Sequence, residues 1–228
     1  NYASVHNWFP ELQLDHDALK DPRYEDCINL MAVGIRLADS VHTVSPSYKE
    51  DVMLPSARPE FVGGESLEKD LQQANNEGRL IGILNASNYN NIRTADKGRL
   101  YRNTVKALFG WLQDESKKYK ADFLAHTGEK IMKHVDEKPK FVVSSVARLT
   151  EQKFYFFKRS PDAFEQMLER LRKIDGIFML LGTGDPDYEE FFRSMSYKHH
   201  NFIFTNGQSE DLIDSIYLES DLYCMPSL

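Results

Sequence analysis

Two cations stand close together just after a predicted buried strand. The strand covers Phe141–Val146, and Arg148 and Lys153 follow it. In an open parallel sheet, ligands bind beyond the carboxyl ends of the strands. A guanidinium and an ammonium on one such loop can hold a diphosphate and stabilise charge on a departing phosphate. The spacing predicts that both side chains reach one pocket. Two unrelated surface cations are the alternative, because Arg and Lys are common on exposed loops.

Two further loops at strand ends carry polar groups. Residues 182–185 read GTGD after an apolar run, and their glycines and free amides can face a nucleotide or phosphate at the start of the next helix. A plain tight turn explains these residues equally well. His6 and Asn7 follow a strand predicted at residues 2–5, where an imidazole and an amide can bind sugar hydroxyls. A structural histidine is the alternative there.

From residue 141 onward, short apolar runs alternate with amphipathic segments, which predicts a parallel sheet covered by helices. The predicted strands lie at Phe141–Val146, 177–181, near 202–204 and at 221–225. Three helices are predicted between and after these strands. The first begins at Ser160 and Pro161, the second covers residues 188–195, and the third begins after Ser209. The helix after Ser209 is expected to bury one face, formed by Leu212, Ile213, Ile216 and Tyr217.

The first part of the chain reads as the end of a similar layered unit. A helix is predicted at residues 27–38, and a strand at 41–44 runs into a helix start at Ser45 and Pro46. Residues 55–78 are rich in Pro, Gly and charge, so we expect a linker or surface loop there and a domain boundary near Leu80. Residues 99–136 predict two helices, the first with a buried side of Val105, Leu108, Phe109 and Leu112.

Composition excludes several classes of function. The 228 residues carry a net charge of -7, so no basic field is available for nucleic acid or an anionic membrane. No apolar run approaches the ~20 residues of a membrane helix, and the start of the chain has no signal-peptide pattern, so a cytoplasmic location is expected. Cys27 and Cys224 lack ligand-like neighbours and are expected to be buried thiols, with no metal site.

Several motifs, in the same order, resemble the bacterial glycogen/starch synthases. Residues 38–48, ADSVHTVSPSY, resemble the family's AD-x-V-x-TVSPxY, and residues 145–153, SVARLTEQK, resemble its SRLTxQKG. Residues 5–7 (VHN), 82–85 (GILN) and 181–186 (LGTGDP) resemble the family's VHN, GxLNGxD and LGxGDP. Residues 209–210 (SE) and 225–227 (MPS) fall where the family has its HE and PSRFEPCGL segments.

The resemblance implies an α/β protein with the glycosyltransferase B architecture of two Rossmann-like domains, the first only partly present. Residues 1–80 would be the C-terminal part of the acceptor-side domain, and residues 81–228 an incomplete nucleotide-sugar-binding domain. The implied reaction is retaining transfer of glucose from ADP-glucose, or another nucleotide-glucose, to the non-reducing end of an α-1,4-glucan. No cofactor and no metal are implied.

The resemblance also implies a role for each matching residue. Arg148 and Lys153 would bind the donor diphosphate and support departure of the nucleoside diphosphate, and His6 would lie at the glucosyl group. The implied substrate-binding residues are Asn7, Asn85, Gly182 and Gly184.

Some positions depart from the family's pattern. Phe154 replaces a glycine of the diphosphate loop, Ala86 a turn glycine, Asn88 a carboxylate, and Gln208 an aromatic residue suited to stacking on a base. Counterparts of the family's KxGGL and EPCGL segments are missing, so we expect a fragment that is inactive alone. A sucrose synthase-like transferase or a non-catalytic glucan-binding relative are the alternatives. Donor base, acceptor length and oligomeric state stay open.

Overall fold

The sheet of the second half of the chain consists of four parallel strands. They are β3 (Phe141–Val146), β4 (Gly176–Leu181), β5 (Phe202–Thr205) and β6 (Leu222–Tyr223), in the order β5-β4-β3-β6. The strand near residues 221–225 therefore lies beside β3, although it is shorter than expected. The prediction of one parallel sheet is confirmed.

The strands of this sheet are buried on both faces. Phe178 and Leu180 pack into one core cluster, and the intervening Ile177, Met179 and Leu181 pack into another. All five side chains are at most 2% exposed. Side chains alternate between the two faces of a strand, so a continuous apolar run is what a doubly covered parallel strand requires.

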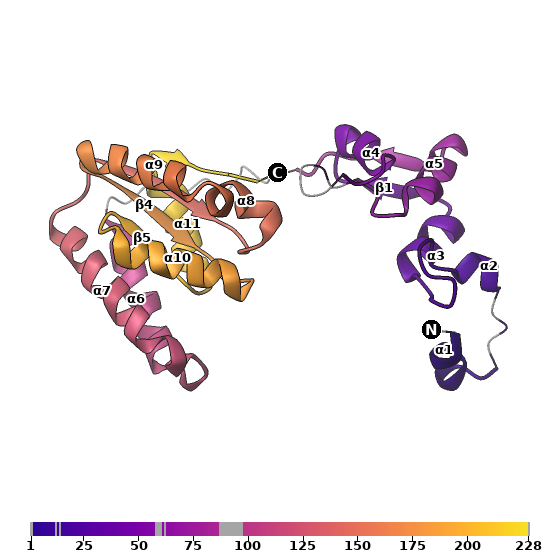
Figure 1. Ribbon diagram of the computed structural model, residues 1–228, viewed down its shortest axis with the longest axis horizontal. Coiled ribbons are helices and arrows are strands. Elements are labelled where there is room, and N and C mark those ends of the chain that lie inside the picture. Colours follow the sequence, from indigo (N-terminus) through magenta and orange to yellow (C-terminus); the bar gives the residue numbers. More distant parts are fainter. Residues whose placement is uncertain are drawn as a thin grey trace. The chain divides into compact units, whose positions relative to one another are not determined.

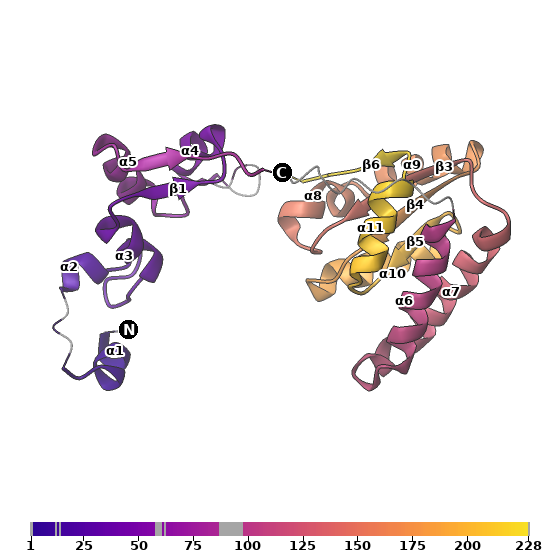
Figure 2. The same cartoon turned by 180° about the vertical axis from the view of Figure 1, so that it is seen from behind.

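Helices cover both faces, as Figures 1 and 2 show from opposite sides. One face carries α8 (Glu151–Arg159), α9 (Pro161–Lys173) and α10 (Pro186–Lys198). The other carries α6 (Arg99–Gln113), α7 (Ala121–Asp136) and α11 (Glu210–Glu219). A short 3-10 helix, η2 (Glu115–Lys120), joins α6 to α7.

The helix starts were predicted more accurately than the buried faces of the helices. The Ser209 hydroxyl caps α11, and Pro161 opens α9, but the Ser160 side chain makes no capping bond. On α6, Phe109 is 62% exposed, and Leu112 is also exposed. The buried stripe instead runs through Leu100, Tyr101, Thr104, Leu108 and Trp111. Phe109 lies one position beyond this stripe, which is about 100° around the helix.

The sequence did not predict α8, because residues 145–153 were interpreted only as a loop motif. Its first turn follows Thr150 directly, and Phe154 inside it has non-helical angles of φ -132° and ψ 18°. Lys153 therefore lies on a helix that begins near the end of β3.

The first half of the chain forms a smaller parallel unit. Strands β1 (Val41–Thr43) and β2 (Leu80–Gly82) pair in parallel. Three helices surround their core: α3 (Leu30–Leu37), α4 (Pro46–Val52) and α5 (Glu68–Asn76). Helix α5 lies inside the expected linker at residues 55–78, because Leu71 and Ala74 give that polar segment a buried face.

The computed structural model describes residues 2–11, 13, 15–57, 61, 63–86 and 98–227, and its contacts divide the chain after Asn90. The boundary was expected near Leu80. Since β2 pairs with β1, residues 80–82 belong to the first unit, and the division comes later. The acceptor-side and nucleotide-side identities of the two units stay predictions.

Residues 2–5 do not form the expected strand. They lie in helix α1 (Tyr2–Trp8), which is followed by the short helix α2 (His16–Leu19). A strand needs a neighbouring strand for its backbone hydrogen bonds, whereas a helix satisfies them within the segment. His6 and Asn7 are consequently helical residues, and both are exposed.

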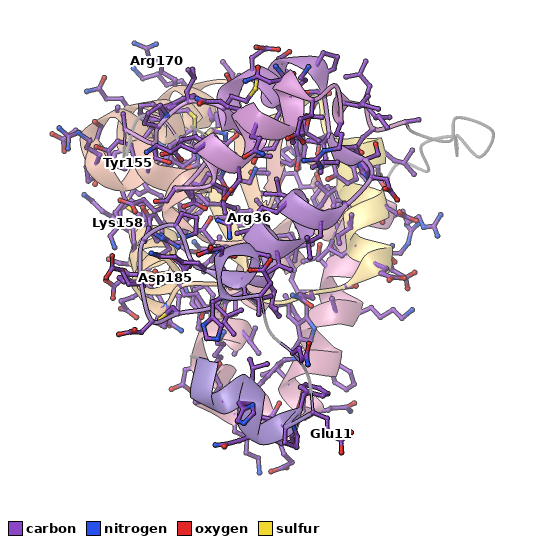
Figure 3. The ribbon with its side chains drawn as sticks, turned by 90° about the vertical axis from the view of Figure 1, so that its right-hand side faces the viewer. Glu11, Arg36, Tyr155, Lys158, Arg170 and Asp185 are labelled. Carbon is purple, nitrogen blue, oxygen red and sulfur yellow. The ribbon has the colours of Figure 1, made fainter. Side chains whose placement is uncertain are left out.

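Arg36, labelled in Figure 3, joins three helices of the first unit. Its Nε and Nη2 donate to the Asp70 carboxylate of α5 at 2.8 and 2.9 Å. Its Nη1 donates to the carbonyls of Ala18 and Lys20 at 3.0 and 2.7 Å. These bonds satisfy carbonyls near the end of α2, because no further helical turn follows to donate N–H groups to them.

The aromatic cluster beneath α9 should dominate the stability of the second unit. The Phe164 ring is 2% exposed and lies 4.4 Å from the Phe157 ring, 5.8 Å from Phe178 and 5.3 Å from Phe202. We expect Phe164→Ala to lower the free energy of unfolding by about 3–5 kcal/mol, measured by urea denaturation. Phe156→Ala is the control, because that ring is 53% exposed. Equal losses in both variants would contradict this account of the core.

Candidate functional site

Arg148 and Lys153 line one cavity at the carboxyl edge of the larger sheet. The cavity has a volume of about 150 Å³. Arg148 comes from the loop after β3 and Lys153 from the first turns of α8, while the segment after β6 supplies the facing wall through Met225, Pro226 and Ser227. The prediction that the two cations reach one pocket is confirmed.

A second, larger cavity of about 340 Å³ adjoins the first through Arg148, which lines both. Gly182 and Thr183, after β4, form part of its wall, and Gln208 and Ser209, before α11, form another part. The site therefore offers a small cationic compartment beside a larger compartment with mixed polar and apolar walls.

The two loops that bound these cavities continue the pairing of β3 with β4. The Leu149 N–H donates to the Thr183 carbonyl at 3.0 Å, and the Asp185 N–H donates to the Leu149 carbonyl at 2.8 Å. The Leu149 side chain is fully buried. This backbone ladder fixes where the chain leaves β3, and so where Arg148 begins.

Glycine is required where these loops touch. A Cβ at Gly182 would lie 2.1 Å from the Ala147 carbonyl oxygen, and a Cβ at Gly184 would lie 2.4 Å from the Leu149 carbonyl oxygen. Both distances are far inside van der Waals contact, so any side chain would force the loops apart. Gly182 also lines the larger cavity.

The amides of Gly182 and Gly184 are not the free anion donors that the sequence predicted, and the role of the two glycines at the substrate stays a prediction. The Gly182 N–H donates to the Thr205 carbonyl at 3.2 Å, and the Gly184 N–H donates to the Glu189 carboxylate at 3.1 Å. Asp185 caps α10 with its own side chain, 2.9 Å from the Asp187 nitrogen. Protein groups therefore already occupy these donors, and the two glycines act by permitting close backbone contact.

Tyr223 supports the loop that carries Arg148, which sequence reasoning did not detect. Its hydroxyl donates to the Val146 carbonyl at 2.8 Å and accepts from the Val146 N–H at 3.1 Å. The side chain thus bonds both backbone groups of the last residue of β3. Burial, with the neighbouring Tyr217 hydroxyl, raises the pKa of Tyr223 to about 12, so the phenol stays neutral.

Glu189 and Lys120 form a buried ion pair behind the 182–185 loop. The Lys120 ammonium lies 2.9 Å from Glu189 Oε2, and the two side chains are only 6% and 12% exposed. Burial by itself raises the pKa of the Glu189 carboxyl, but hydrogen bonds from Lys120 and the Gly184 N–H outweigh it. The pKa is therefore held below its ordinary value.

The other predicted site residues lie in the first unit. His6 and Asn7 belong to α1, and Asn85 follows β2; all three side chains are exposed. Their role at the sugar stays a prediction. Ala86 is exposed as well, and Asn88 lies outside the described residues.

Phe154 does not obstruct the cationic cavity. Its ring is fully buried and meets the Phe192 ring edge-on at 5.1 Å, inside the aromatic core. Its φ of -132° is open to any L-residue, so glycine is not needed there. Gln208 lines the larger cavity, and its Nε2 lies 3.5 Å from the Thr183 hydroxyl.

Three further expectations from the sequence concern a metal site, membrane helices and the two cysteines. Among the described residues, no group of three or more His, Cys, Asp and Glu side chains is placed to hold a metal ion. Nor does this part of the chain include a helix long and apolar enough to cross a membrane. Cys27 and Cys224 are free, and each is half-buried rather than fully buried as expected.

Comparison with known proteins confirms the resemblance seen in the motifs. The family model of the starch synthase catalytic domain matches residues 2–73. A glycogen synthase of Lachnospira eligens is 31% identical over 206 residues, which cover 90% of this chain and 38% of that protein. A glycogen synthase of Streptococcus sanguinis is 32% identical over 207 residues, with the same coverage.

A solved structure shares the fold. It is the catalytic domain of starch synthase IV from Arabidopsis thaliana, bound to ADP and acarbose, with a TM-score of 0.56 and 23% identity. The match covers 91% of this chain and 38% of that one. The chain thus spans about 38% of the length of the relatives that it matches.

The close contact at Gly182 can be tested by comparing its alanine variant with that of a glycine whose Cβ position is empty. We expect Gly182→Ala to destabilise the chain by about 1–3 kcal/mol, because the added methyl meets the Ala147 carbonyl. Gly128→Ala on α7 is the matched control: nothing lies within 4 Å of its Cβ position, so it should stabilise by up to about 1 kcal/mol. Urea denaturation measures both. A neutral Gly182→Ala would show that the loops tolerate separation.

The depressed pKa of Glu189 predicts a pH dependence of stability. A carboxyl with a lowered pKa contributes stability above its ordinary value, 4.5, and loses that contribution as the pH falls below it. We expect Glu189→Gln to cost about 3 kcal/mol at pH 7 and progressively less towards pH 3, measured by urea denaturation. Glu190→Gln is the control, since that side chain is 73% exposed. If Glu189→Gln lowers the free energy of unfolding equally at pH 3 and pH 7, the charged Glu189 carboxylate does not stabilise the protein as described.

Proposed function

From its similarity to glycogen and starch synthases, we propose that this chain belongs to their family and forms part of a retaining glucosyltransferase. The enzyme transfers glucose from a nucleotide-glucose donor to the non-reducing end of an α-1,4-glucan. The chain supplies the diphosphate-binding cations of that enzyme. A cytoplasmic location belongs to the same proposal.

One observation carries the proposal: Arg148 and Lys153 line a single cavity, and Arg148 also lines the larger cavity beside it. A nucleoside diphosphate needs cations at its phosphates and a neighbouring space for its nucleoside. The smaller cavity would receive the diphosphate, and the larger would receive the nucleoside between the loops after β4 and β5. Guanidinium and ammonium groups suit phosphate oxygens, the first by a bidentate contact and the second as a point charge.

In this proposal the two cations act on the leaving group. As the bond between glucose and the diphosphate breaks, negative charge grows on the departing phosphate, and preorganised positive groups stabilise it without a metal ion. His6 is proposed to lie at the glucosyl group, and Asn7 and Asn85 to contact the sugar. Gly182 and Gly184 contribute by shaping the loop rather than by donating their amides.

The proposed donor is ADP-glucose. The starch synthase of similar fold was solved with ADP and acarbose. The size of the larger cavity and its position beside Arg148 support an adenosine compartment there. Gln208 stands where a stacking aromatic is expected, so its own contact to the base would be polar.

The non-catalytic alternative loses one of its supports. It rested partly on Phe154 in place of a glycine, and that ring turns into the core and leaves the cationic cavity open. We therefore retain the catalytic assignment.

Nucleotide binding by the 228-residue chain tests this proposal. We expect ADP to bind, and Arg148→Ala and Lys153→Ala each to weaken binding about 10-fold or more, because each removes a charge-assisted contact to phosphate. Isothermal titration calorimetry gives the Kd. Arg170→Ala is the control: this exposed cation of α9 lines neither cavity, and its side chain points away from the ribbon in Figure 3.

Two results would reject the assignment. One is absence of ADP binding by the unaltered chain at millimolar concentration. The other is a loss in Arg170→Ala as large as the loss in Arg148→Ala, which would mean that net charge alone draws the nucleotide.

A further inference from the structure

Three buried polar side chains meet behind the loop that borders the larger cavity. Taken as whole residues, with backbone included, Lys120, Glu189 and Asn206 are 6%, 9% and 1% exposed. They come from the end of η2, from α10 and from the turn after β5. Lys and Glu are rarely buried unless they are paired, so this cluster requires an explanation.

The cluster holds the 182–184 loop at both ends. Glu189 Oε1 accepts the Gly184 N–H at 3.1 Å, and Asn206 Nδ2 donates to the Gly182 carbonyl at 3.3 Å. Lys120 links these two contacts, because its ammonium donates to Glu189 Oε2 at 2.9 Å and to Asn206 Oδ1. One cation therefore fixes the orientation of both side chains that hold the loop.

Stability alone is a weak explanation for such a pair. Taking two charges out of water is costly, and apolar residues of similar volume often replace a buried ion pair with no loss of stability. What apolar residues cannot supply is an acceptor for the Gly184 N–H. The distinctive contribution of the pair is thus a contact to the loop.

We propose that Lys120, Glu189 and Asn206 are positioning residues, which hold the 182–184 loop in the shape that admits a nucleoside diphosphate. Gly182 and Thr183 line the larger cavity, so a shift of this loop changes the walls that the nucleoside meets. Because Leu149 is bonded to Thr183, the same shift is passed to the loop that carries Arg148. This inference rests on the proposed function of the two cavities.

Lys130 offers a matched control within the same unit. It is 4% exposed, and its ammonium donates to the carbonyls of Ser196, His199 and Phe202. Phe202 begins β5, whereas Asn206 directly follows its end. The two buried lysines therefore bond to opposite ends of β5, and of the two only Lys120 is bonded to side chains that hold the loop.

The test compares Lys120→Met, the double variant Lys120→Met with Glu189→Met, and Lys130→Met in the 228-residue chain. Three quantities are measured: the midpoint of urea denaturation, the Kd for ADP, and the hydrogen-exchange rate of the Gly184 amide without nucleotide. The exchange rate reports on the loop even if ADP does not bind.

We expect Lys120→Met to weaken ADP binding about 10-fold or more, as small misplacements of binding groups do, and to speed exchange at Gly184. The double variant should recover stability relative to Lys120→Met, because it removes both buried charges. Its ADP affinity and its Gly184 protection should not recover. Lys130→Met should lose stability while its ADP affinity and Gly184 exchange stay within about 2-fold of the unaltered chain, since its contacts lie away from the loop.

Recovery of stability and ADP affinity together in the double variant would overturn the positioning role. So would unchanged Gly184 exchange in Lys120→Met. If the unaltered chain fails to bind ADP, the proposed function fails, and the exchange rates still decide whether the three residues hold the loop.

Discussion

The site depends on one constraint, the close contact between the backbone after β3 and the backbone after β4. Glycine at 182 and 184 lets the Ala147 and Leu149 carbonyls approach to distances that any Cβ would forbid. The hydrogen bonds of Leu149 with Thr183 and Asp185 then extend the parallel ladder beyond both strands. As a result, the strand-end loops are held by backbone bonds, like the strands themselves, and the residues that they carry begin from fixed positions.

This constraint explains why Arg148 and Lys153 converge. Leu149 lies between the two cations in the sequence, and its side chain is fully buried. The chain must therefore leave β3, anchor at Leu149 and enter α8 within a few residues. Tyr223 adds a bond to each backbone group of Val146 and thereby fixes the start of the same path. Preorganised charges stabilise a developing anion without reorganisation during the reaction, and a backbone that is hydrogen-bonded at Val146 and at Leu149 provides that condition.

The sequence predicted the parts of the fold that follow from local periodicity. Residues 177–181 are a continuous apolar run, and residues 141–146 consist mostly of β-forming residues; a strand buried on both faces has that pattern. The convergence of Arg148 and Lys153 followed from the rule for strand ends. The strand predicted at residues 2–5 was wrong because four residues carry too little pattern to separate a strand from a helix. The prediction that Phe109 is buried was wrong because the expected buried face of the helix included one position too many.

The contacts that the sequence could not predict share a physical cause. Lys120 and Glu189 are 69 residues apart, and Lys120 and Asn206 are 86 residues apart. No period links such positions, and the lysine reads as part of a solvated helix face until the tertiary fold buries it. Likewise, the motif at residues 182–185 suggests free amides, yet the N–H groups of Gly182, Gly184 and Asp185 already donate to protein oxygens. A glycine-rich loop therefore has two uses for its missing side chains, contact with a ligand and contact with its own neighbours, and only the positions of those neighbours tell which one applies.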